Sequence, residues 1–283
     1  MLTVNNTPVE LYGYKKHEYW VKREDLACKE PGPPFAKIRG LERHLTTLKE
    51  RGVETVGYMD TAISMAGWGI SYVCQEIGLR AVIYYPSYKS GLRYNQAQFL
   101  PLWQRFGATT VPITPPTRLQ INIHMAKRQF KTDYPQGVWL EYGLRLKETV
   151  KAVEEESVRT FKQMTPKTII CSVGSGIMLA GVIRAVVNEG VGVKDIYGVL
   201  VNSGANVDKK QMDVYKYADM YNDFFTPFNF SLSLVNGRYR YEDKAKAPTP
   251  FPCNEYYDLK AYEWMVKNMR QLKKPILFWN VGG

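Results

Sequence analysis

The sequence Trp20-Val-Lys-Arg-Glu-Asp-Leu26 is followed by a loop, Glu30-Pro-Gly-Pro-Pro34, and then by Ala36-Lys37-Ile-Arg-Gly-Leu-Glu-Arg43. After Lys37, apolar residues recur at helical spacing at Ile38, Leu41, Leu45 and Leu48. The pattern predicts a strand end, a loop, and a helix whose first turn carries Lys37. The positive end of a helix dipole favours a neutral lysine, and a neutral amine can form a Schiff base with a carbonyl cofactor. An ordinary solvated lysine at a helix start is the alternative.

Apolar strands and amphipathic helices alternate along most of the chain. The expected strands are 53–59, 81–85, 107–113, 138–140, 168–171, 195–201 and 275–279. The expected helices are 70–77, 90–106, 119–130, 147–164, 177–188 and 256–272. This alternation predicts the α/β class, with parallel sheets covered by helices. The tract 202–252 is irregular and rich in Tyr, Asn and Pro, which is typical of a lid or a binding loop.

With 283 residues, of which 45% are hydrophobic, the chain can bury a large core in one or two domains. No apolar run follows basic residues at the start, and no stretch reaches the length of a membrane span. The four cysteines form no Cys-x-x-Cys pair and the three histidines are isolated. We therefore expect no metal site, no disulfide framework and a cytoplasmic location.

The chain is basic, with 38 Lys and Arg against 27 Asp and Glu, a net charge of +11. Such a balance attracts phosphate-rich partners, although net charge does not determine fold. The cations are spread along the chain rather than gathered in one run. A merely soluble basic surface and a polyanion-binding surface are both consistent with this pattern.

The sequence Ser172-Val-Gly-Ser-Gly-Ile177 lies between a predicted buried strand and a predicted helix. Glycines let backbone N–H groups converge there, and the helix N-terminus adds positive potential, so a phosphate fits. A tight turn between strand and helix needs glycine for steric reasons as well. The pattern is neither the phosphate loop of nucleotide hydrolases nor a full dinucleotide fingerprint.

A lysine loop near the start and a Gly-Ser-Gly turn past the middle resemble the fold-type-II pyridoxal 5′-phosphate (PLP) enzymes. The chain looks most similar to the branch of aminocyclopropane-carboxylate (ACC) deaminase and D-cysteine desulfhydrase. The resemblance implies two α/β domains with PLP in their cleft: a large domain from 1–45 and 141–283, and an inserted small domain, 46–140. It implies that Lys37 is the Schiff-base lysine and the base at Cα. The implied phosphate ligands are Gly174, Ser175, Gly176 and Ile177, with Met178 standing where a threonine is usual.

Two further motifs depart from the family pattern. In Thr61-Ala-Ile-Ser-Met-Ala-Gly-Trp68, Met and Ala replace the Asn and His of the usual Ser-Asn-His. The resemblance makes Thr61, Ser64 and Trp68 substrate-binding candidates, although Ser64 equally fits a helix N-cap. The C-terminal Leu-Phe-Trp-Asn-Val-Gly-Gly is similar to the family's Leu-Phe-x-His-Thr-Gly-Gly. Val281 takes the threonine position, so Asn280 is the candidate partner of the cofactor's ring nitrogen.

Tyrosines supply the remaining acid–base candidates. Glu255-Tyr-Tyr257-Asp258-Leu-Lys-Ala resembles the deaminase Pro-Val-Tyr-Glu-Gly-Lys, which implies a catalytic Tyr257. Tyr239 lies where the deaminases carry a second active-site tyrosine. A phenol can move protons if nearby cations lower its pKa. With 20 tyrosines in the chain, packing is the alternative role for either residue.

The basic charge and the altered carboxylate loop favour an amino acid attached to a nucleotide or to DNA as the substrate. Bacteriophages use type II PLP enzymes to rework glycyl-thymidine during DNA hypermodification, and this chain is similar to what such an enzyme requires. We therefore expect a PLP-dependent isomerase or lyase. It would form a carbanion at the glycyl Cα and shift the thymine methylene from nitrogen to that carbon, in the host cytoplasm.

Two other functions stay open. The first is a PLP-dependent deaminase, desulfhydrase, lyase or racemase of a small free amino acid. The second is a cofactor-free nucleic-acid-binding protein on a degenerate scaffold, which the residues Met65, Met178 and Val281 favour. Relatives are commonly dimers, so a homodimer is also compatible with the sequence.

Overall fold

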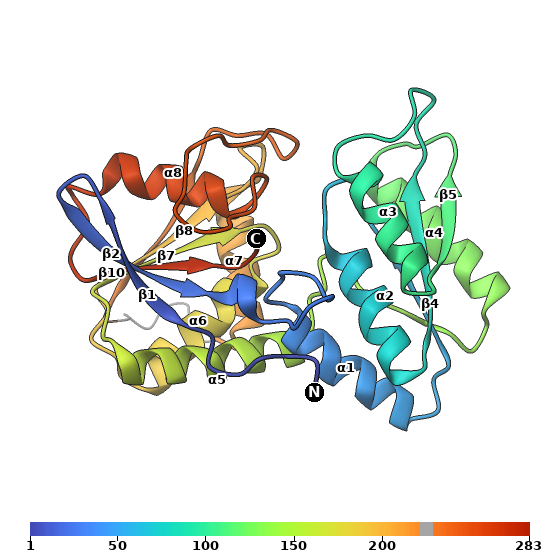
Figure 1. The fold of residues 1–283 in the computed structure, drawn as a ribbon, viewed down its shortest axis with the longest axis horizontal. Coiled ribbons are helices and arrows are strands. Elements are labelled where there is room, and N and C mark those ends of the chain that lie inside the picture. The colour runs from blue at the N-terminus through green and yellow to red at the C-terminus, as the bar shows by residue number, and fades with distance from the viewer. Residues whose placement is uncertain (221–228) are drawn as a thin grey trace. The chain divides into compact units, whose positions relative to one another are not determined.

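The computed structural model describes residues 1–220 and 229–283 (Figure 1). The chain divides into two compact units. The smaller contains Met1–Leu2, Glu30–Pro33 and Leu41–Leu146, and the larger contains Thr3–Lys29, Pro34–Gly40 and Lys147–Gly283. Helix α1 (Ile38–Glu50) begins in the larger unit and continues in the smaller one. The role of the larger unit as the cofactor-binding domain stays a prediction at this stage.

The larger unit is built on a six-stranded sheet in the order β1-β2-β10-β7-β8-β9. Its strands are β1 (Val9–Tyr14), β2 (His17–Arg23), β7 (Thr168–Val173), β8 (Asp195–Leu200), β9 (Ser231–Asn236) and β10 (Ile276–Asn280). β1 and β2 are antiparallel and every other pair is parallel. The last strand, β10, lies between β2 and β7, where Phe278 pairs with Val21 on one side and Ile170 on the other.

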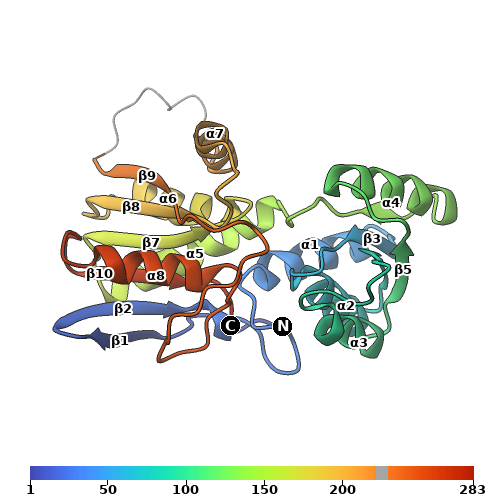
Figure 2. The ribbon, with the colours of Figure 1, turned by 90° about the horizontal axis from the view of Figure 1, so that it is seen from above.

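Helices cover both faces of this sheet. They are α5 (Lys147–Gln163), α6 (Ile177–Asn188), α7 (Val207–Tyr217) and α8 (Asp258–Asn268), with the short 3-10 helix η1 (Glu24–Leu26) after β2. Figure 2 shows α8 on one face and α5 and α6 on the other. Along β7, Ile169 and Cys171 pack with α6 while Ile170 packs with α8. A strand buried on both faces reads as a continuous apolar run, which is why β7 was predictable.

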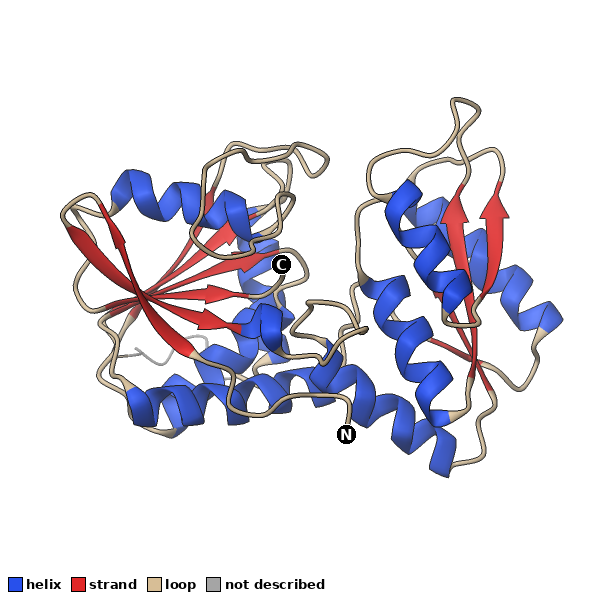
Figure 3. Ribbon diagram, in the orientation of Figure 1, coloured by secondary structure: helices blue, strands red, loops and turns tan. Residues whose placement is uncertain are grey.

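The smaller unit has a four-stranded parallel sheet in the order β5-β4-β3-β6. The strands are β3 (Thr55–Met59), β4 (Arg80–Pro86), β5 (Thr109–Ile113) and β6 (Val138–Trp139). The helices are α2 (Ala66–Ile77), α3 (Gln96–Arg105) and α4 (Leu119–Asp133). α2 and α3 lie in front of the sheet and α4 behind it (Figure 3). Both units confirm the α/β class.

Two expectations about secondary structure were wrong. The tract 202–252 is not irregular throughout, because it contains α7 and β9, while residues 221–228 lie outside the described part. Lysine and aspartate dominate α7, which weakens its apolar period. The helix expected over 90–106 begins at Gln96, since Gly91 (φ +86°) and Tyr94 (φ +52°) both adopt left-handed backbone.

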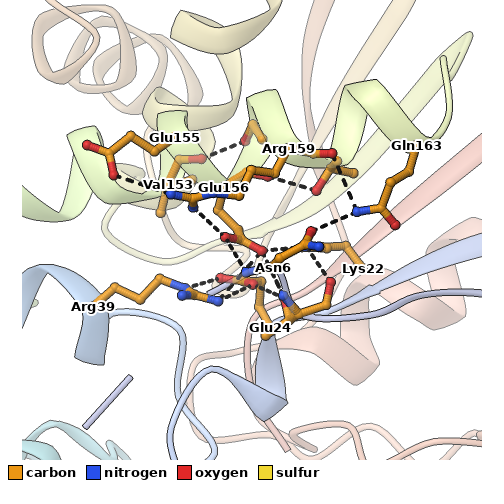
Figure 4. A network of polar contacts seen from close by, with 12 residues as sticks. Asn6, Lys22, Glu24, Arg39, Val153, Glu155, Glu156, Arg159 and Gln163 are labelled. Carbon is orange, nitrogen blue, oxygen red and sulfur yellow. Dashed lines mark hydrogen bonds and ion pairs between the residues drawn. The ribbon is translucent and has the colours of Figure 1, made fainter. Parts of the chain in front are cut away.

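A buried network of charges connects β2, η1, α1 and α5 (Figure 4). The Lys22 amine donates to Glu156 at 2.6 Å and to the Thr7 carbonyl at 2.6 Å, and both charged side chains are fully buried. Arg39 makes two hydrogen bonds of 3.0 Å to Glu24. Burial opposes the charge of Glu156, but Lys22 and Arg39 overcome it and lower the pKa of Glu156 to about 2. The network thereby fixes the first turn of α1, next to Lys37.

Candidate active site

Lys37 stands on a loop that is hydrogen-bonded to the end of β10. The Ala36 N–H donates to the Val281 carbonyl at 2.9 Å, and the Gly283 N–H donates to the Pro34 carbonyl at 3.1 Å. Phe35 forms an isolated bridge with Gly282. The backbone before Lys37 is therefore held by a segment about 245 residues away in sequence.

The turn 174–177 joins β7 to α6 and has the form of an anion site. Gly176 has a φ of +93°, a conformation that favours glycine, and a Cβ there would lie 2.9 Å from Val214. The first N–H groups of α6 have no intrahelical partners, and the helix dipole adds positive potential. The Lys37 amine donates to the Ser175 hydroxyl at 3.2 Å. The structure thus brings together the lysine and the turn that the sequence predicted as partners.

Tyr257 lies beside the same turn. Its Cε1 is 3.6 Å from the position a Cβ would take on Gly174. Its hydroxyl shares a short hydrogen bond with the hydroxyl of Tyr241, a residue that was not among the sequence candidates. Tyr241 comes two residues after Tyr239 in the same Tyr-Arg-Tyr sequence, and that proximity is the only signal that could have indicated it.

Tyr239, in contrast, donates its hydroxyl hydrogen bond to Glu263. Burial and the Glu263 carboxylate raise the pKa of Tyr239 to about 12. The structure thus places Tyr241, rather than Tyr239, against Tyr257. The catalytic role of Tyr239 stays a prediction.

Lys260 fixes the segment that carries Tyr241. Its fully buried amine donates to the carbonyls of Val201 and Arg240 at 2.9 Å each and to that of Tyr241 at 3.2 Å. Burial lowers the pKa of Lys260 to about 8. The three hydrogen bonds hold the backbone on either side of Tyr241 in place.

Asp258, which the resemblance matches to the glutamate after the deaminase tyrosine, was not among the predicted site residues. Its carboxyl group accepts from the Ser172 hydroxyl at 2.7 Å and from the Val281 N–H at 3.2 Å. It therefore lies at the carboxyl ends of β7 and β10, next to the turn 174–177. Burial raises the pKa of Asp258 to about 7, so its charge is adjustable near neutral pH.

Asn280 is buried at the end of β10. Its amide donates to Asp25 and to the Pro252 carbonyl, both at 2.9 Å. Among the described residues its Oδ1 has no hydrogen-bond partner. Asn280 can therefore accept one more hydrogen bond but has no donor left, which limits it to a protonated ring nitrogen.

In the smaller unit, the loop carrying Thr61 and Ser64 is held by hydrogen bonds between its own residues. Asp60 accepts from the N–H groups of Thr61 and Gly67, and burial raises the pKa of Asp60 to about 7. The Thr61 hydroxyl accepts from two further N–H groups, at 3.1 and 3.2 Å, and Ser64 accepts from Ala66 at 3.0 Å. Within the described residues the Trp68 indole N–H is buried without a partner.

Metal and membrane features are absent from the described part of the chain. Across residues 1–220 and 229–283, no group of three or more His, Cys, Asp or Glu could hold a metal ion. None of the helices described there combines the length and apolarity needed to cross a membrane.

Comparison with known proteins decides the family. No protein-family model matches the chain. The glycyl-dTMP PLP-dependent decarboxylase of Pseudomonas phage M6 is 35% identical over 289 residues, covering 99% of this chain and 100% of the phage protein. This chain belongs to the family of that phage enzyme. The family is PLP-dependent, as the sequence motifs predicted.

Solved structures agree on the fold. An ACC deaminase homologue superposes with a TM-score of 0.80 at 17% identity, covering 100% of this chain and 90% of its own. The O-acetylserine-dependent cystathionine β-synthase of Helicobacter pylori gives a TM-score of 0.68 at 12% identity, covering 98% and 92%. Both likenesses concern the fold alone, and they confirm the fold-type-II architecture expected from the sequence.

The residues of the larger unit fit PLP. The turn 174–177 offers backbone donors to a phosphate, and Lys37 reaches that turn. Asn280 has an unused buried oxygen, and Asp258 is a carboxyl group poised near neutral pH. Asn280 stays the predicted partner of the cofactor's ring nitrogen, and Asp258 is a second candidate for that role. Met178 does not contribute, because its side chain is packed in the apolar core.

Proposed function

We propose that this protein is a PLP-dependent decarboxylase acting on the amino-acid part of a thymidine nucleotide of the glycyl-dTMP kind. The observation that carries the proposal is the Lys37 amine, 3.2 Å from Ser175 on an anion-binding turn, in a chain 35% identical to the phage enzyme. The net charge of +11 supports an anionic nucleotide, or DNA, as the substrate. A host-cytoplasmic location and a homodimer are parts of the same proposal.

When bound, PLP would withdraw electrons from the α-carbon of an amino acid whose nitrogen is joined to it, so that a bond at that carbon can break. In the proposed reaction the bond from the α-carbon to the carboxylate breaks, CO₂ leaves, and a proton takes its place. Lys37 Nζ holds and delivers that proton. The hydrogen-bonded pair of Tyr241 and Tyr257, beside Gly174, is the second proton-transfer group.

The loop that carries Thr61 and Ser64 has few backbone donors left for a ligand. We include Thr61, Ser64 and Trp68 among the substrate contacts, as the sequence predicted. The N–H groups of this loop that donate to Asp60, Thr61 and Ser64 are not available to a substrate carboxylate. A carboxylate held by few donors loses CO₂ more easily than one that is well solvated.

Isomerisation of glycyl-thymidine is the second candidate. It begins with removal of a proton from the same α-carbon, for which Lys37 is equally placed, and it keeps the carboxylate. Deamination, desulfhydration or racemisation of a free amino acid is supported only by the shared fold. Membership of a PLP-dependent family favours any of these enzymes over a cofactor-free DNA-binding scaffold.

The first test measures the visible absorption spectrum of the purified protein. The purified protein should show a visible PLP absorption band that Lys37→Ala removes and the exposed control Lys209→Ala keeps. Glycyl-dTMP, DNA carrying the glycyl group, D-cysteine and ACC are then supplied in turn and the products are weighed by mass spectrometry. Loss of CO₂ supports decarboxylation, whereas an unchanged mass with altered fragmentation supports isomerisation. Turnover of free amino acids alone would eliminate a nucleotide substrate.

A further inference from the structure

Side chains of helix α7 pack against the turn 174–177, and one of them is a lysine. Val214 and Lys210 are one helical turn apart and lie on the same face of α7. Val214 Cγ2 is 2.9 Å, and Lys210 Cδ is 3.9 Å, from the position of a Cβ on Gly176. The Lys210 side chain is only 15% exposed. Its neighbour Lys209 is exposed and belongs to another face.

Two lysine side chains therefore lie against the same four-residue turn and come from different elements. Lys37 contacts Ser175, while the aliphatic end of Lys210 lies against Gly176. A lysine Nζ is two bonds beyond its Cδ, so rotation of the end of the side chain can bring the Lys210 amine from Asp213 to an anion seated on the turn. Asp213 pairs with Lys210 at 3.7 Å, a partly exposed contact that contributes little energy.

The turn has a specific need for such a cation. Met178 stands where the resemblance of the sequence implies a threonine, and its side chain is buried in the apolar core and cannot donate a hydrogen bond. A charged donor forms a shorter and stronger hydrogen bond with phosphate than a hydroxyl does. We propose that Lys210 binds the phosphate of PLP and replaces the missing hydroxyl donor. The inference rests on the proposed PLP dependence.

The experiment compares PLP with pyridoxal, which lacks the phosphate. Each is titrated into wild-type protein and into Lys210→Met, Lys210→Arg and Lys209→Met, and binding is followed by the visible absorption band. Lys210→Met should weaken PLP binding about 10- to 100-fold and leave pyridoxal binding nearly unchanged. Lys210→Arg should recover most of the loss, and Lys209→Met should behave like wild type.

The following results would overturn the inference. Equal loss of PLP and pyridoxal in Lys210→Met would indicate a structural role, as would a lowered unfolding midpoint. Unchanged PLP binding with weakened dTMP binding would assign the lysine to the substrate's phosphate. Absence of PLP binding by the wild-type protein would remove the proposed function as well, whereas wild-type binding that is insensitive to Lys210→Met would remove this inference alone.

Discussion

Glu156→Gln should destabilise the larger unit by about 3 kcal/mol. The Glu156 carboxylate is fully buried. It accepts hydrogen bonds from the Lys22 amine at 2.6 Å, from Arg159 at 2.8 Å and from the Thr7 N–H at 2.8 Å. Each unit of pKa corresponds to about 1.4 kcal/mol, so lowering the pKa from 4.5 to about 2 stabilises the ionised carboxylate by about 3 kcal/mol. The amide preserves the shape but leaves Lys22 buried without an opposite charge at that position, which is among the costly changes in a protein interior.

The effect also has a defined pH dependence. The pKa of Glu156 is lower in the folded chain than in the unfolded chain, so its contribution is complete above pH 4.5 and is lost as pH falls toward 2. The stability difference between wild type and Glu156→Gln should therefore shrink over that interval. Urea denaturation followed by circular dichroism at several pH values measures it, and hydrogen exchange of β2 and α5 peptides assigns it to the larger unit.

The neighbouring Glu155 provides the control. Its side chain is 33% exposed and its contact with Arg159 is 3.9 Å, so Glu155→Gln should change stability by at most about 0.5 kcal/mol. If the free energies of unfolding of Glu156→Gln and Glu155→Gln agree within experimental error, the network does not stabilise the fold, and the reasoning from burial and pairing fails.

Gly40→Ala should lower the urea midpoint by the equivalent of about 3 kcal/mol, because its Cβ would lie 2.3 Å from the backbone of α5, whereas Gly13→Ala meets no atom within 4 Å and should be neutral. Tyr241→Phe should slow turnover about 100-fold and alter its pH profile, and a larger loss in Tyr239→Phe would contradict the placement of these hydroxyls. Because burial raises the pKa of Asp60 from 3.8 to about 7, wild-type stability should fall as pH rises across that range. Asp60→Asn should reduce that slope in urea titrations, and an unchanged slope would contradict the assignment.

Sequence reasoning predicted those elements of the candidate site that depend on local patterns. The lysine before α1 and the glycine turn before α6 each have a local signature, so their pairing across 138 residues was predictable. The contact between Tyr241 and Tyr257 depends on how the loop after β9 returns to the sheet, which no periodicity encodes. Asn280 was predicted as a ring-nitrogen partner, but its amide donors are committed to Asp25 and Pro252, a detail that only tertiary structure reveals.

The central position of β10 determines when the site can form during synthesis. All residues of the smaller unit precede Lys147, so this unit can fold while the ribosome is still translating the remainder. The larger sheet, however, lacks a strand between β2 and β7 until residue 280 emerges. The loop before Lys37 is made early and acquires its anchor only after β10 has been synthesised. A chain that stalled before β10 would thus carry one finished unit and a sheet with an open gap, a species exposed to mispairing until β10 is made.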